Sequence, residues 1–101
     1  FLVVTMIQLG GNITLDGFEL EPSSLVIVKK IVGNYAKNIY TNITSFENLN
    51  IRLKEGSSLK EIESVLLVNN NEVSVIASDP NLFFALDKSL ALLVEKAKNS
   101  E

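Results

Sequence analysis

The sequence of 101 residues contains no cysteine and no histidine. Without cysteine, a disulfide scaffold, a thiolate metal site and a cysteine nucleophile are all excluded. Without histidine, the commonest general base and the commonest metal ligand are also missing. We therefore expect no catalytic residue, no metal ion and no cofactor in this chain.

The sequence also lacks an excess of basic residues and a long apolar run. Lysine and arginine total 9 against 12 aspartates and glutamates, a net charge of −3, whereas proteins that bind nucleic acids are usually basic. No apolar run approaches the roughly 20 residues of a membrane-spanning helix. The apolar start FLVVTMI is short and has no basic segment before it. We therefore expect a cytoplasmic protein with no membrane contact.

The size and composition fit one folded domain spanning residues 1–101. Hydrophobic residues make up 47% and charged residues 21% of the chain, which is close to ordinary globular usage. Two interpretations of the first five residues stay open. They begin the first strand, or they precede a native start at Met6 and are not native.

Four segments have the pattern of strands. Residues 3–15 are rich in β-branched residues, and Gly10-Gly11 marks a bulge or an end. Residues 46–55 alternate from Leu49, with apolar and polar side chains on opposite faces. Residues 59–68 and 72–78 follow, and the intervening Asn69-Asn70-Asn71 predicts a hairpin turn because asparagine tolerates left-handed backbone angles.

Two segments have the pattern of amphipathic helices. From Ser23 to about Thr41 the apolar residues recur at three- and four-residue steps, and Pro22 suits the first turn. The apolar stripe of this helix consists of Leu25, Val28, Val32, Tyr35 and Ile39, widened by Ile27 and Ile31. In the last helix, Asp79 is the expected N-cap and Pro80 the first helical residue. The buried stripe there consists of Phe83, Leu86, Leu90, Leu93, Val94 and Ala97.

The order of elements is therefore β-α-β-β-β-α, which predicts an α+β fold. The first two strands are joined by a helix and should be parallel, whereas the later strands are joined by short turns and should be antiparallel. Each helix has one apolar stripe, so we expect both helices on one face of a four-stranded mixed sheet.

From residue 7 to about residue 99 the sequence resembles the ribosome hibernation-promoting factor family, also called ribosome-associated translation inhibitors or sigma modulation proteins. The resemblance rests on three segments, the lysine-containing helix EPSSLVIVKKIVGNYAKNIY, the meander NLNIRLKEG…LKEIESVLLV…EVSVIAS, and the junction ASDPNLFFALDKSLALLVEKAK. It implies a fold similar to that of double-stranded-RNA-binding domains.

The resemblance also implies a function. It implies a ribosome-associated, non-enzymatic factor that contacts small-subunit RNA and restrains translation. Carried over to this sequence, the candidate RNA-binding residues are Lys30, Lys37, Arg52, Lys54, Lys88, Lys96 and Lys98. The sequence departs from the family in its acidic balance, because Asp87 and Glu95 alternate with the lysines of the last helix.

Two other functions stay open. The first is a protein-interaction or dimerisation module, a possible homodimer, in which Val65 and Leu67 on the exposed sheet face form the interface. RNA binding requires the basic side chains to gather on one face of the folded chain, which distinguishes it from this alternative. Otherwise each lysine is an ordinary solvated residue.

The second is an enzyme that uses Glu61 and Glu63. A strand places these carboxylates on one face about 7 Å apart, a separation at which two carboxylates can divide acid and base roles. On an open sheet such pairs are more often solubilising charges, so we expect no enzymatic activity.

Overall fold

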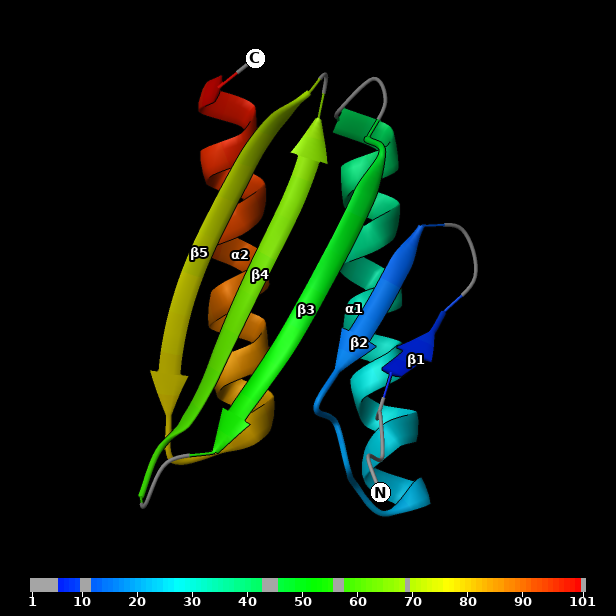
Figure 1. The fold of residues 1–101 in the computed structure, drawn as a ribbon, viewed down its shortest axis with the longest axis vertical. Helices are drawn as coiled ribbons and strands as arrows, with labels where there is room; N and C mark the ends of the chain where they lie inside the picture. Colours follow the sequence, from blue (N-terminus) through cyan, green and yellow to red (C-terminus); the bar gives the residue numbers. More distant parts are fainter. Residues whose placement is uncertain (1–5, 10–11, 43–45, 56–57, 69, 101) are drawn as a thin grey trace, which may run out of the picture.

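The computed structural model describes residues 6–9, 12–42, 46–55, 58–68 and 70–100. Its elements, in chain order, are β1 (Met6–Gln8), β2 (Ile13–Asp16), α1 (Pro22–Asn42), β3 (Asn48–Glu55), β4 (Lys60–Val68), β5 (Asn71–Asp79) and α2 (Leu82–Ser100). The strands form one sheet in the order β1-β2-β3-β4-β5, and both helices lie on the same face of it (Figure 1). The other face of the sheet is not covered by any described element.

The sheet has five strands, so the predicted count of four is wrong. The segment predicted as one strand over residues 3–15 contains two short strands, and β1 pairs antiparallel with β2. The backbone N–H of Leu9 donates to the carbonyl of Ile13 at 2.9 Å, which is where the chain reverses direction. The predicted bulge or strand end at Gly10-Gly11 lies, like residues 1–5, outside the described residues.

The remaining strand pairings confirm the predicted topology. Strand β2 pairs parallel with β3, as expected for two strands connected through a helix. Strand β3 pairs antiparallel with β4, and β4 pairs antiparallel with β5. Asn70 in the last turn has φ of 64°, the left-handed conformation that asparagine tolerates.

The hydrophobic core lies between the sheet and the two helices. Alternate strand residues point inward, and α1 and α2 each turn one apolar stripe toward them. The large apolar side chains with 0% exposure are Leu15, Val28, Ile39, Leu49, Ile51, Ile62, Leu66, Leu86, Leu90 and Leu93. Ile27 is 44% exposed and does not widen the α1 stripe as predicted, because it lies roughly 100° around the helix from the buried Val28.

The start of α2 differs from the prediction by two residues. Asn81, not Asp79, is the N-cap, because its Oδ1 accepts the backbone N–H groups of Phe83 and Phe84 at 2.9 and 3.2 Å. Asp79 stabilises the turn before the helix, because its Oδ1 accepts the backbone N–H of Asn81 at 2.9 Å. Pro80 lies in that turn, whereas Pro22 begins α1 as expected.

Candidate nucleic-acid interface

Lys30 and Lys37 lie on the face of α1 that points away from the sheet. Both are exposed, because Val28, Val32 and Ile39 occupy the opposite, buried side of the same helix. These lysines form no ion pair with another described residue. Their ammonium groups are therefore open to an anionic partner.

The three α2 candidates have different surroundings. Lys88 pairs with Asp79 at 3.1 Å, and this carboxylate also accepts a backbone N–H from Asn81, which is the larger cause of its lowered pKa. Lys96 donates to the backbone carbonyl of Ser74 at 3.0 Å. Lys98 lies exposed in the last turn of α2.

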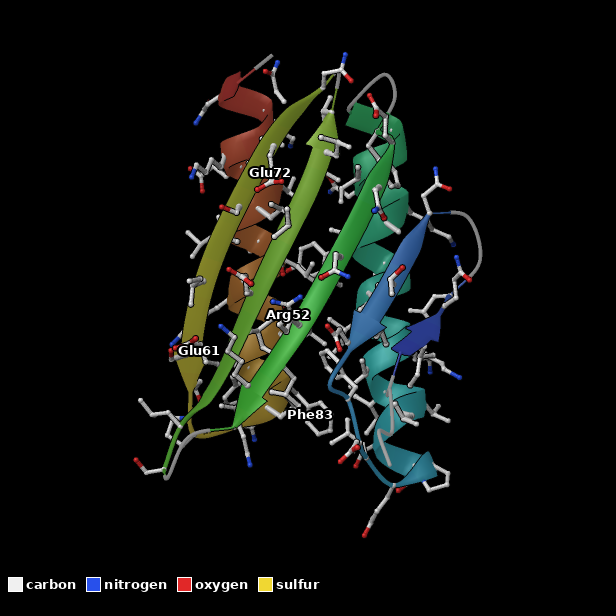
Figure 2. The ribbon with its side chains drawn as sticks, viewed as in Figure 1. Arg52, Glu61, Glu72 and Phe83 are labelled. Atoms are coloured by element: carbon white, nitrogen blue, oxygen red, sulfur yellow. The ribbon has the colours of Figure 1, made fainter. Side chains whose placement is uncertain are left out.

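Arg52 and Lys54 lie on the uncovered face of the sheet, on the opposite side of the molecule from Lys30 and Lys37. In Figure 2 the labelled Arg52 projects from the sheet face turned toward the viewer, whereas the helices lie behind the sheet. Arg52 Nε contacts Asp16 Oδ2 at 3.1 Å, and its Nη1 lies 3.9 Å from Glu63 Oε1. The strand register explains this arrangement, because Arg52 is the cross-strand partner of both residues.

The seven candidates therefore do not gather on one face, contrary to the requirement stated for RNA binding. The physical reason is the layered fold. Outward residues of a strand and outward residues of a helix must point in opposite directions when both helices cover the same side of the sheet. The candidates form two groups, one on the helices and one on the sheet.

Acidic side chains are distributed unevenly between the helices and the sheet. The helices contain few of them, so the helical layer is the more basic surface. Helix α1 contains three lysines and no acidic residue, whereas α2 contains three lysines and two acidic residues. The helices thus hold six of the nine basic residues but two of the twelve acidic residues of the chain. Lys29, exposed on α1, belongs to this layer and was not among the predicted candidates. Counting charges per helix would have identified it.

The two helices are joined at their exposed side by a hydrogen bond from Tyr35 Oη to Asp87 Oδ1, 2.7 Å long. Burial, followed by this bond and the charge of Asp87, raises the pKa of Tyr35 from 10.0 to about 12. Asp87 is one of the two acids on α2, so its charge is turned toward the contact between the helices.

The uncovered sheet face contains a shallow depression of about 400 Å³, lined by Asn48, Asn50, Arg52, Glu63, Val65, Leu67 and Glu72. Val65 and Leu67, the predicted protein interface, are half-buried there. Figure 2 labels Glu72, which lines the depression, and Glu61, which lies further along the sheet. Apolar, polar and charged groups therefore share this face.

The carboxylate pair considered for catalysis lies on this same open face. Glu63 contacts Arg52, and Glu61 is the cross-strand partner of Lys54. These contacts fit charges that stabilise strand pairing. Within the described residues there is no cluster of potential ligands suited to a metal ion, and no helix is both long and apolar enough to cross a membrane.

Comparisons with known proteins show what this fold is similar to. No protein-family model and no curated protein matches the sequence. Among solved structures, the N-terminal domain of Protein Y from Thermus thermophilus matches with a TM-score of 0.65 and 16% identity over 94% of this chain and 100% of that one. A ribosomal subunit interface protein from Coxiella burnetii matches with a TM-score of 0.57 and 15% identity, over 88% of this chain and 89% of that one.

These matches confirm at the level of the fold the resemblance that the sequence predicted. The similarity to double-stranded-RNA-binding domains stays a prediction, as do the individual RNA-binding residues.

Proposed function

We propose that this chain is a ribosome-associated, non-enzymatic protein of the cytoplasm. The observation that carries the proposal is the fold similarity to the Protein Y domain, which covers 94% of this chain and all of that domain. A second similar structure is that of a ribosomal subunit interface protein. The functional interpretation rests on this shared architecture together with the basic helical layer.

The proposed contact is between small-subunit RNA and the helices. Lys30 and Lys37, with the neighbouring Lys29, form the part of this surface that has no acidic residue on its own helix. Lys98 extends it onto α2, whereas Lys88 is already paired with Asp79. Lysines placed in this way contact phosphates, which supply affinity and orientation without reading the base sequence.

Arg52 and Lys54 fit this role less well. Arg52 already contacts two carboxylates on the sheet, so binding phosphate would require it to give up these contacts or to accept nearby negative charge. Lys96 is likewise engaged with the backbone of β5. The helical lysines are therefore the centre of the proposed interface, and the sheet residues are peripheral.

We further propose that binding restrains translation by occupying RNA surface that the working ribosome needs. A bound protein of this kind requires no chemistry, only residence on the subunit. Addition of the protein to a cell-free translation reaction should lower the yield in proportion to the fraction of subunits occupied.

The test of the proposal is co-sedimentation with purified bacterial small ribosomal subunits over a series of salt concentrations. With about four phosphate contacts, the logarithm of the binding constant should fall with the logarithm of salt concentration with a slope of about −3. Failure to sediment with the subunits at low salt would contradict the proposal. Binding that is insensitive to salt would contradict the lysine-phosphate contact specifically.

The second candidate is a protein-interaction or dimerisation module that uses the uncovered sheet face. Val65 and Leu67 within the depression favour it, since apolar groups on an open face often mark an interface. Val65→Lys should then abolish association with the protein partner or second copy while leaving binding to small subunits unchanged. Loss of subunit binding in this variant would instead place the ribosome contact on the sheet.

A further inference from the structure

Strand β5 forms an open edge of the sheet. It is the last strand in the sheet order, and among the described strands it pairs only with β4. It is nine residues long, whereas β1 at the opposite edge has three. A long edge strand presents backbone donors and acceptors that another strand can pair with.

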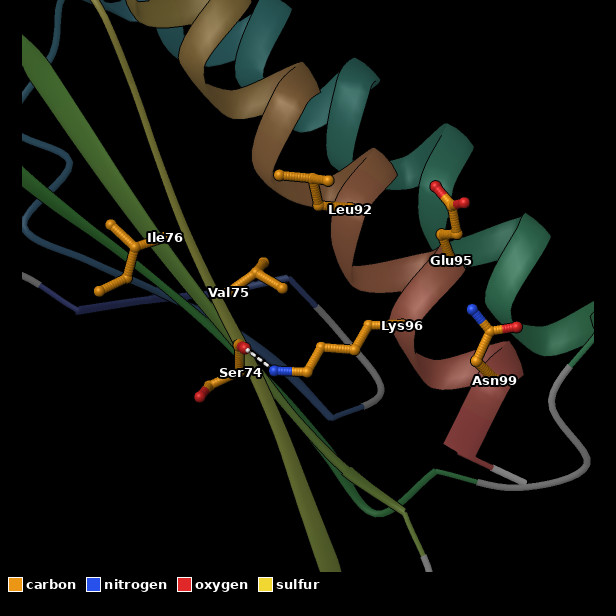
Figure 3. Close-up of a pocket in the computed structure, with 7 residues that line it drawn as sticks. All are labelled: Ser74, Val75, Ile76, Leu92, Glu95, Lys96 and Asn99. Atoms are coloured by element: carbon orange, nitrogen blue, oxygen red, sulfur yellow. Dashed lines mark hydrogen bonds between the residues drawn. The ribbon is translucent and has the colours of Figure 1, made fainter.

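The contact made by Lys96 shows which backbone groups face this edge. Its Nζ reaches from α2 to the carbonyl oxygen of Ser74 (Figure 3). In an antiparallel strand the N–H and C=O of one residue point to the same side, and the side alternates along the strand. The outward backbone groups are therefore those of Glu72, Ser74, Ile76 and Ser78.

The edge is flanked by apolar side chains on both layers. Ile76 on the sheet is 56% exposed, and Leu92 on α2 is 48% exposed. Between the strand and the helix runs a groove of about 500 Å³, which these two residues line together with Glu95 and Lys96. Figure 3 shows Leu92 and Lys96 projecting from α2 toward the strand.

We propose that this edge pairs antiparallel with β5 of a second copy of the chain, so that the two sheets become one. With the two-fold axis at Val75, Ser74 lies opposite Ile76 of the second copy and Glu72 lies opposite Ser78 of the second copy. All four residues present their backbone to the edge, so their donors and acceptors match. No two like charges face each other across this register, which removes the usual obstacle to self-pairing.

The groove explains why a second copy fits better than an isolated extended peptide. An antiparallel pair within one sheet has its two-fold axis perpendicular to the sheet, so the helices of both copies lie on the same face. Each copy brings its own α2 to cover the inner side of the joined strands. The oppositely charged Glu95 and Lys96 on one helix can then face Lys96 and Glu95 on the other, which is a self-complementary arrangement.

Lys96 also controls how accessible the β5 backbone is to a second strand. In the single chain its ammonium group contacts the Ser74 carbonyl from α2, and a lysine placed at a sheet edge is a common protection against unwanted pairing. Pairing requires Lys96 to leave this carbonyl and contact the second copy instead. The association is therefore reversible and depends on protein concentration.

The test is the molar mass of the full chain measured by light scattering across a wide concentration series. The wild type should pass from monomer to dimer. Ser74→Pro removes the outward N–H without removing a bond to β4, so it should remain monomeric with an unchanged circular dichroism spectrum. Ile76→Lys, at an already exposed site, should raise the dissociation constant by about tenfold or more.

Two matched controls locate the interface. Val26→Lys makes the same kind of change at a 61% exposed position on α1 and should leave the dimer intact. Val65→Lys tests the uncovered sheet face and should also leave it intact. A wild type that stays monomeric at all concentrations would overturn the proposal, as would a dimer that survives both Ser74→Pro and Ile76→Lys or dissociates in Val65→Lys.

Discussion

At the scale of the residue, the two described glycines have opposite roles. Gly17 follows β2 with φ of +79°, and a Cβ added there would lie 2.7 Å from the backbone oxygen of Leu53. Gly33 lies in the middle of α1, and a Cβ added there would meet nothing within 4 Å. The backbone requires glycine at the first position, whereas at the second it only weakens the helix.

We therefore predict that Gly17→Ala and Gly33→Ala change stability in opposite directions. Gly17→Ala should lower the free energy of unfolding by about 2 kcal/mol, because it combines backbone strain with a clash. Gly33→Ala should raise it by about 1 kcal/mol through better helix propensity. Urea denaturation of both variants measures this, and equal effects would contradict the local geometry described for Gly17.

The cap of α2 shows a limit of sequence interpretation at the same scale. The sequence SDPN offers two side chains suited to an N-cap, Asp79 and Asn81, and proline is compatible with the first helical turn. The choice depends on whether the chain turns before or after Pro80. Asp79 accepts the N–H of Asn81, which holds the turn and moves the helix start two residues along the chain.

At the scale of the element, a buried hydroxyl pair connects β4 to α2. Ser64 and Ser89 are both fully buried, with 0% exposure, and their Oγ atoms lie 2.7 Å apart. Each hydroxyl is surrounded by apolar side chains, so removal of one leaves the other without this partner. The net cost of losing such a partner is about 1–3 kcal/mol.

A double-mutant cycle tests this connection. Ser64→Ala and Ser89→Ala should each lower the free energy of unfolding by about 1–2 kcal/mol, and the double variant should lose less than the sum of the two. Chemical denaturation of the three variants and the wild type gives the coupling energy. Strict additivity would show that the hydroxyls do not depend on each other.

The contact between α1 and α2 should make stability depend on pH in the alkaline range. Because the pKa of Tyr35 is raised from 10.0 to about 12 in the folded chain, the folded state holds this proton more tightly than the unfolded state does. The contribution is fully present below pH 10 and is lost as pH rises toward 12. Tyr35→Phe removes the titrating hydroxyl and should abolish this part of the pH dependence.

Urea unfolding of wild type and Tyr35→Phe at several values between pH 9 and pH 11.5 measures the difference. Lysines titrate in the same range but are common to both proteins, so the comparison isolates the tyrosine. A difference in stability that stays constant over this range would contradict the raised pKa of Tyr35.

Most helices and strands could be predicted from the regular spacing of their apolar residues, because each of these elements buries one face. The alternation around Leu49 and the helical spacing around Val28 both survive in the folded chain. The β1–β2 hairpin could not be predicted in this way, since three or four residues are too few to establish a period. Both strands are rich in β-branched and apolar residues, so the sequence pattern predicts a single strand there.

The candidate site was less predictable because it depends on how the elements are placed relative to one another. Seven basic residues could be identified one at a time, but their division between two faces follows from both helices covering the same side of the sheet. This consequence was already implicit in the predicted topology. The sequence alone also shows that α1 contains no acidic residue. This feature indicates the basic surface more directly than any single lysine does.

At the scale of the whole molecule, the net charge is −3, but acidic and basic residues are distributed unevenly over the surface. The helical layer holds most of the basic residues, whereas the strands and loops hold ten of the twelve acidic ones. An acidic protein can therefore still offer one basic face to RNA, because phosphate contacts depend on local charge within about a Debye length of 10 Å.

Pairing through β5 would extend this surface. It would place the helices of two copies on one side of a continuous sheet, so that two basic layers face the same direction. The proposed ribosome contact and the proposed pairing can nevertheless be separated experimentally, since Ser74→Pro affects the edge and leaves the α1 lysines in place.

The most direct test of the account compares two variants that each lose two positive charges, Lys30→Gln/Lys37→Gln on the helical layer and Arg52→Gln/Lys54→Gln on the sheet. Their binding to small ribosomal subunits should be measured against salt concentration. The account predicts that the helical variant binds more weakly and that the magnitude of its salt slope falls by about 1.5, whereas the sheet variant keeps the wild-type slope. The opposite pattern, or equal loss in both variants, would contradict the assignment of RNA contact to the helices.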